Sequence, residues 1–193
     1  MKYKLLLVLF LISFILQSVF IFTFKEDPLA ADGSDYYEIS QNILHKQASI
    51  LGGYLNLRRP PVYPFLLAII FFLFGNQLIA AQLFQAVLIA LVPVIIYLLG
   101  RLIFNEKTAV IGAVLTCFNP VLLASSFYIL TEALTIFLVT LAALLLTKAF
   151  LSEKKSLFLI CGILIGIITL ARPVLIVFPI LILPLRAEHR KSL

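Results

Sequence analysis

Residues 5–24 read LLLVLFLISFILQSVFIFTF and contain no charged side chain. A membrane-spanning helix needs about 20 mostly apolar residues, and Lys2 and Lys4 precede this run. A secretory signal peptide has a shorter apolar region, of roughly 7–15 residues, followed by a small-residue cleavage site. The stretch therefore predicts a first membrane-spanning helix that is retained and has its amino end in the cytoplasm.

The rest of the chain has the same character. Of its 193 residues, 63% are hydrophobic and 12% are charged, whereas a soluble domain is about half apolar and about a quarter charged. This composition excludes an ordinary soluble enzyme. Further apolar segments follow the first, at 78–99, 109–128, 133–151, 157–171 and 173–185. We therefore expect an all-α, polytopic membrane protein, a single module over 1–193 with about six transmembrane helices.

The segment 62–74 is apolar but short, and charge decides its place. If it does not cross the membrane, ten of the Lys and Arg residues lie in the cytoplasm and five outside, as the positive-inside rule requires. We therefore expect a multi-pass plasma-membrane protein with both termini in the cytoplasm, a first extracytoplasmic loop over 25–77, and interfacial helices within that loop. Segment 62–74 would be an amphipathic or re-entrant helix on or partway into the outer leaflet. The net charge of +6 then reports orientation and not a nucleic-acid partner.

Two aspartates stand near the start of the 25–77 loop. Asp35 with Glu38 three residues later resembles a capping box, which predicts a short amphipathic helix beginning at Tyr36. Asp32 lies one turn earlier, beside Gly33, and has no capping role in this interpretation. Asp32 is then the freer carboxylate at the membrane surface, the alternative being an ordinary solvated loop acid.

The same loop ends with Arg58 and Arg59, followed by Pro60 and Pro61. Two arginines on the outer side oppose the topology trend, so a role other than orientation is expected for them. Arginine presents a planar fork of donors that suits phosphate. The alternative is binding of ordinary lipid headgroups.

Glu132 and Arg172 occupy the two other outer turns. Glu132 in the first turn of a helix is favoured by the helix dipole, and Arg172 can reach lipid headgroups, so both have a purely structural explanation. An acid at the edge of the hydrocarbon is nevertheless costly without a partner or a function. Together with Asp32 and Arg59, they predict a site for an anionic, lipid-linked substrate on one membrane face.

An ordered set of short motifs extends this prediction along most of the chain. The set is Asp32-x-x-x-Tyr36-x-x-Ile39-Ser40-x-Asn42-Ile43-Leu44, Gly53-Tyr54, Arg59-Pro60-Pro61-x-Tyr63-Pro64, Leu73-Phe74-Gly75, Gly100-Arg101-Leu102-Ile103-Phe104, Asn119-Pro120, Thr131-Glu132 and Ala171-Arg172-Pro173. It resembles the GT-C glycosyltransferases, in particular the protein O-mannosyltransferase and aminoarabinose-transferase group known as glycosyltransferase family 39.

The resemblance implies transfer of a sugar from a polyprenyl-phosphate donor to a lipid, glycan or protein hydroxyl on the extracytoplasmic side, with inversion. It implies that Asp32 is the general base and that Arg59, assisted by Arg58 or Arg172, binds the donor phosphate. Glu132 would orient the acceptor or hold a divalent cation; no metal ligand set or other cofactor is predicted. The supporting residues would be Asp35, Tyr36 and Tyr63.

Members of this family are usually much longer and have more membrane spans. The chain therefore looks like the N-terminal half of such an enzyme. The alternative is a truncated or non-catalytic membrane subunit or scaffold that needs a partner chain to supply the missing helices. A small transporter is a weaker interpretation, because no predicted span carries a charge at mid-depth.

Overall fold

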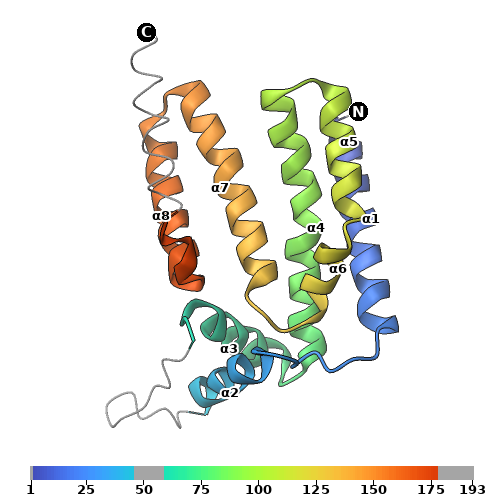
Figure 1. The fold of residues 1–193 in the computed structure, drawn as a ribbon, viewed down its shortest axis with the longest axis vertical. Helices are drawn as coiled ribbons and strands as arrows, with labels where there is room; N and C mark the ends of the chain where they lie inside the picture. Colours follow the sequence, from blue (N-terminus) through green and yellow to red (C-terminus); the bar gives the residue numbers. More distant parts are fainter. Residues whose placement is uncertain (1, 46–58, 178–193) are drawn as a thin grey trace.

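The computed structural model describes residues 2–45 and 59–177 of the protein (Figure 1). Over these ranges the chain is all-helical and has no strand, which confirms the predicted fold class. The elements are α1 (Lys2–Thr23), α2 (Gly33–Leu44), α3 (Val62–Phe74), α4 (Leu78–Ile103), α5 (Glu106–Cys117), α6 (Pro120–Phe127), α7 (Glu132–Ser152), α8 (Lys155–Ala171) and a short 3-10 helix, η1 (Pro173–Val177).

Three of these helices, α1, α4 and α7, are long and apolar enough to cross a membrane. The consecutive helices α5 and α6 make a fourth candidate if the pair is one broken span. Helix α8, which matches the predicted fifth span, falls in the class of shorter apolar helices, and residues 178–185 of the predicted sixth span lie outside the described ranges. The described part of the chain thus offers three to four candidate spans, and the full set of six stays a prediction.

The predicted span 109–128 consists of two helices, α5 and α6, which are bent by 48° relative to each other. The cause is local, because Pro120 stands at the start of α6 and lacks the N–H that would continue α5. The side chain of Asn119 caps α6 by accepting a hydrogen bond from Val121 N at 2.9 Å. The bend brings the end of α6 and the connection to α7 back towards α4.

Helices α2 and α3 lie side by side across one end of the long helices (Figure 1). At the same end, α1 and α8 finish, α4 begins and α6 connects to α7. We call this the α2–α3 end. The N-terminus and the α4–α5 and α7–α8 turns lie at the opposite end. Segment 62–74 is therefore a helix at one end of the bundle, as an interfacial helix would be, and does not run parallel to the long helices.

Charge is divided between the two ends of the described chain. The α2–α3 end carries most of the acids, namely Glu26, Asp27, Asp32, Asp35, Glu38 and Glu132, with the bases Lys25, Arg59 and Arg172. The opposite end carries mostly bases, namely Lys4, Arg101, Lys107, Lys148, Lys154 and Lys155, with the acids Glu106 and Glu153. Under the positive-inside rule this division favours a cytoplasmic location for the basic end.

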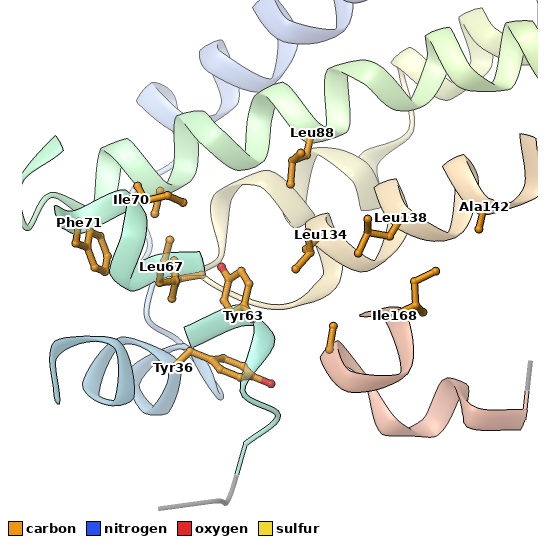
Figure 2. Close-up of a cluster of buried hydrophobic side chains, with 13 residues drawn as sticks. Tyr36, Tyr63, Leu67, Ile70, Phe71, Leu88, Leu134, Leu138, Ala142 and Ile168 are labelled. Atoms are coloured by element: carbon orange, nitrogen blue, oxygen red, sulfur yellow. The ribbon is translucent and has the colours of Figure 1, made fainter. Parts of the chain in front are cut away.

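The main buried cluster joins the α2–α3 end to α4, α7 and α8 (Figure 2). Tyr36 of α2 and Tyr63 of α3 lie in it, 6% and 1% exposed, with Leu134 and Leu138 of α7 and Ile168 of α8 as neighbours in the cluster. Two amphipathic helices that rested only on lipid would not bury such large side chains. The core therefore fixes the α2–α3 end against the bundle.

Replacement of Gly100 by valine is expected to destabilise the protein by about 1–3 kcal/mol, the usual cost of overpacking. A Cβ at Gly100 would lie 3.0 Å from Ala109 Cα and 3.1 Å from its Cβ, so α4 and α5 would have to separate. Thermal unfolding in detergent measures the effect. Gly162→Val is the matched control, since a Cβ there meets nothing within 4 Å; an equal loss of stability in both variants would contradict the prediction.

Candidate functional site

Arg59 holds two carboxylates at the α2–α3 end. Its Nη1 donates to Asp32 Oδ2 at 2.8 Å and its Nη2 to Asp32 Oδ1 at 2.5 Å, so the pair is bidentate. Its Nε donates to Asp35 Oδ2 at 3.0 Å. The hydrogen bond with Asp35, aided by the charge of Asp32 and opposed by partial burial, raises the pKa of Arg59 above its ordinary value. The structure thus brings Arg59 together with two predicted site residues that lie 24 and 27 positions earlier in the sequence.

The predicted helix start at Tyr36 is wrong, and with it the assignment of Asp35 as the cap. Helix α2 begins at Gly33, where Gly33 N donates to Ala30 O and Ser34 N donates to Leu29 O. Asp32 is the N-cap residue, but its side chain makes no capping hydrogen bond. The turn that precedes the helix supplies the early contacts instead, so both aspartates are left to bind Arg59.

Tyr36 and Tyr63 form an aromatic support beneath this ion pair. Their ring centroids are 5.2 Å apart and their planes make an angle of 88°, a favourable edge-to-face arrangement. The Arg59 guanidinium carbon lies 5.8 Å from the Tyr36 ring centroid, within the range of a cation–π contact. Figure 2 shows the two tyrosines next to each other near the start of α3.

Both phenols keep their protons at physiological pH. Burial raises the pKa of Tyr36, while a hydrogen bond with Thr131 and the charge of Arg59 lower it less. Burial also raises the pKa of Tyr63 well above its ordinary value, assisted by the charge of Glu132. The two side chains therefore act as neutral hydrogen-bonding groups.

Glu132 and Arg172 form an ion pair at the α2–α3 end. Arg172 Nη1 donates to Glu132 Oε1 at 3.1 Å. The other carboxylate oxygen, Glu132 Oε2, is buried and has no hydrogen-bond partner among the described residues. Glu132 stands in the first turn of α7, where the helix dipole favours a negative charge. One oxygen of this carboxylate is thus left to bind something else.

A cavity of about 420 Å³ is lined by Asp32, Tyr36, Glu132 and Arg172. The remaining lining residues are Pro60, Leu130, Thr131, Ala171, Pro173 and Val174. Four segments remote in sequence therefore form one pocket with acids, an arginine and an apolar wall.

Two contributors to the site were not predicted from the sequence. Thr131 lines the cavity and hydrogen bonds with Tyr36. Gln85 of α4 accepts a hydrogen bond from Tyr63 Oη at 2.5 Å. A glutamine inside an apolar span is a signal that could have indicated Gln85, because buried polar side chains in membranes seek partners.

Two sequence-based assignments are not resolved by this geometry. Arg58, the second predicted phosphate ligand, lies outside the described residues. Within the described ranges, no three His, Cys, Asp or Glu side chains come together as a metal-binding group. The divalent cation left open by the sequence stays open.

Taken together, the fold and the pocket define a helical membrane protein with a charged cavity at one end of its bundle. Residues 58–193 match a family described as Dolichyl-phosphate-mannose-protein mannosyltransferase, and the chain belongs to this family. No curated protein and no solved structure matches the chain.

The family match confirms the resemblance to GT-C enzymes noted from the motifs. It supports a membrane glycosyltransferase-like role and implies a lipid-linked sugar donor. The matched range contains Arg59, Glu132 and Arg172 but begins after Asp32 and Asp35, so the assignment of the two aspartates rests on the motif pattern and on their contacts with Arg59.

Proposed function

We propose that this protein transfers a sugar from a polyprenyl-phosphate donor to an acceptor hydroxyl, with inversion at the anomeric carbon, and that the cavity at the α2–α3 end is its active site. The observation that carries the proposal is the convergence of Asp32, Glu132 and Arg172 on one cavity, in a chain of a mannosyltransferase family. Arg59 extends this group through its ion pair with Asp32.

In the proposed reaction, the acceptor oxygen attacks the anomeric carbon of the donor sugar. The bond between that carbon and the phosphate oxygen breaks, and its electron pair leaves with the polyprenyl phosphate. Asp32 takes the proton of the acceptor hydroxyl as a general base. Charge develops on the departing phosphate, so fixed cations beside it lower the barrier.

Arg59 is the proposed cation for the donor phosphate, and it must then exchange partners. Its fork is occupied by Asp32 and Asp35, but both carboxylates are at least 40% exposed. Ion pairs open to water are weak, so a phosphate, which suits the same fork, competes well. Transfer of Arg59 to the phosphate also frees Asp32 to act as a base, which links donor binding to activation of the acceptor.

Glu132 is the proposed ligand for the acceptor. A buried carboxylate oxygen without a partner is costly, and Glu132 Oε2, in a residue that lines the cavity, has none in the described part of the chain. An acceptor hydroxyl that donated to it would satisfy it. Arg172 donates a hydrogen bond to Glu132 Oε1, and this contact fixes the direction in which Glu132 Oε2 points.

Glu132→Gln is expected to lower the rate of transfer about tenfold to a hundredfold, the range for loss of a group that orients a substrate. Arg172→Ala should act on the same contact, so the double variant should be little worse than Glu132→Gln alone. Initial rates of the wild type, the two single variants and the double variant in proteoliposomes complete a double-mutant cycle. Full additivity of the two losses would show that the residues act separately.

We further propose that the protein is a multi-pass plasma-membrane protein with cytoplasmic termini, so that the α2–α3 end faces outward. Under this proposal a membrane-impermeant thiol reagent added to intact cells labels Asn76→Cys and not Asn105→Cys. Both asparagines are exposed, at opposite ends of the bundle, while the native Cys117 and Cys161 are buried. Labelling of position 105 in intact cells, with position 76 protected, would reverse the orientation.

The proposed activity is tested by incubation of the protein in proteoliposomes with polyprenyl-phosphate-mannose, radiolabelled in the sugar, and a membrane extract as acceptor. The expected result is transfer of the label and release of sugar-free polyprenyl phosphate. Liposomes without the protein are the control. Thermal unfolding is used to verify that the reconstituted protein is folded. Absence of both products from a folded protein would favour the alternative, a non-catalytic membrane subunit.

A further inference from the structure

Gln85 is a buried polar side chain of α4 that the proposed reaction does not use. It lies on α4, seven residues or about 10 Å inside the first residue of that helix, and is 2% exposed. Its Oε1 accepts a hydrogen bond from Tyr63 Oη at 2.5 Å. Its Nε2 donates to Ser126 O at 3.2 Å and to Tyr128 O at 3.0 Å. One side chain thus links α3, α4, the end of α6 and the α6–α7 connection.

Only two side chains separate Gln85 from the guanidinium group of Arg59. Tyr63, which Gln85 holds by its hydroxyl, packs edge-on against Tyr36. The Tyr36 ring in turn lies beneath the Arg59 guanidinium. Aromatic rings in a close-packed core have little freedom to reorient, so the position of the Tyr63 hydroxyl is transmitted to Tyr36.

We propose that Gln85 is a positioning residue that fixes the place of the Arg59 guanidinium beside the cavity through Tyr63 and Tyr36. The inference rests on the proposed function for its kinetic consequence, since that function uses Arg59 and Asp32. A side chain at Gln85 without an acceptor leaves the buried Tyr63 hydroxyl unsatisfied. Tyr63 then moves to find another partner, and the support beneath Arg59 moves with it.

Gln82 provides a matched control for the purely structural role of Gln85. It lies one turn earlier on α4, is 5% exposed, and donates to Phe127 O at 2.8 Å. Both glutamines therefore hold carbonyl groups where α6 ends, but the hydrogen bond from Tyr63 goes to Gln85. Gln82→Leu removes only a hydrogen bond to a carbonyl group at the end of α6. Gln85→Leu removes such bonds and also the acceptor of the Tyr63 hydroxyl. Tyr63→Phe removes the hydrogen bond between position 63 and Gln85 Oε1 but leaves the bonds of Gln85 Nε2 to the Ser126 and Tyr128 carbonyl oxygens in place.

The kinetic test compares these three variants and the double variant Tyr63→Phe with Gln85→Leu in proteoliposomes. Gln85→Leu and Tyr63→Phe are each expected to lower kcat about tenfold or more, as small displacements of catalytic groups do. The double variant should be no slower than Gln85→Leu, because both changes break one link. Gln82→Leu should lower Tm about as much as Gln85→Leu and leave kcat near that of the wild type.

A second readout does not depend on activity. 3-Fluorotyrosine placed at position 36 is followed by ¹⁹F NMR in the full chain. The resonance is expected to shift or broaden in Gln85→Leu and in Tyr63→Phe and to stay unchanged in Gln82→Leu. If the ¹⁹F resonance shifts in Gln85→Leu and Tyr63→Phe but the wild type transfers no sugar, the proposed function is wrong, while the coupling of Gln85 to Tyr36 stands.

Two other results would overturn the inference itself. One is a ¹⁹F resonance at position 36 that is unchanged in both Gln85→Leu and Tyr63→Phe, whatever the rates of sugar transfer by these variants. The other is a fall of kcat in Gln82→Leu equal to that in Gln85→Leu, which would make the effect one of general stability.

Discussion

Asp32→Asn is expected to reduce the rate of sugar transfer by about 10²- to 10⁴-fold, the usual contribution of a positioned general base. An amide has the shape of the carboxylate but cannot take the proton of the acceptor hydroxyl. The change should leave the fold intact, because the Asp32 side chain makes no capping hydrogen bond to α2 and is half exposed. Initial rates at saturating donor measure the effect.

Two controls separate loss of the base from other effects of this substitution. Asp27→Asn makes the same chemical change five residues earlier, and asparagine retains the oxygen that accepts from Leu29 N; its rate should equal that of the wild type. Asp35→Asn weakens the hold on Arg59 without removing a group that lines the cavity, and should cost less than Asp32→Asn. Equal rates for Asp32→Asn and the wild type would remove Asp32 from the role of base.

Arg59→Lys is expected to lower kcat/KM for the polyprenyl-phosphate donor by about 10²- to 10³-fold, the size of effect seen when one donor to a developing oxyanion is removed. Lysine keeps the charge but lacks the planar fork that binds two oxygens at once. The bidentate contact with Asp32 shows that the fork at position 59 can engage an oxyanion in this way. Titration with sugar-free polyprenyl phosphate should show a matching loss of affinity.

Arg101→Lys is the matched control for Arg59→Lys. Arg101 also pairs with a carboxylate, through Nε and Glu106 Oε2 at 2.8 Å, and also lies over a tyrosine ring. The two arginine side chains are similarly exposed, 30% for Arg101 and 27% for Arg59. They differ in the end of the bundle at which they lie, so an equal loss of donor affinity in both variants would contradict the location of the phosphate site.

Apolar run length was enough to predict α1, α4, α7 and α8, because backbone groups in lipid must be satisfied within the helix, but it did not predict the break between α5 and α6. Charge placement was enough to predict that 62–74 does not run with the long helices, and that Glu132 and Arg172 lie at the same end as Asp32. These features depend on composition along the chain, and a sequence displays composition directly.

The finer structure depended on local backbone chemistry and on contacts between distant residues. Helix α2 begins at Gly33 because backbone groups of the preceding turn supply the first hydrogen bonds, which the pattern Asp35 to Glu38 does not reveal. The pairing of Arg59 with both aspartates spans more than twenty residues. The link from Gln85 to Tyr63 joins two helices by one hydroxyl, and no spacing rule predicts such a contact.

The central claim is that the cavity at the α2–α3 end binds a lipid-linked sugar, and photo-crosslinking tests it without knowledge of the acceptor. Polyprenyl-phosphate-mannose with a photoreactive group on the sugar is irradiated with the protein in proteoliposomes, and the labelled residues are mapped by mass spectrometry. We predict labels on Leu130–Glu132 and Ala171–Val174, which line the cavity, suppressed by excess unlabelled donor and by Arg59→Lys but not by Arg101→Lys. Labels confined to the α4–α5 and α7–α8 turns, or labelling that excess donor leaves unchanged, would contradict the claim.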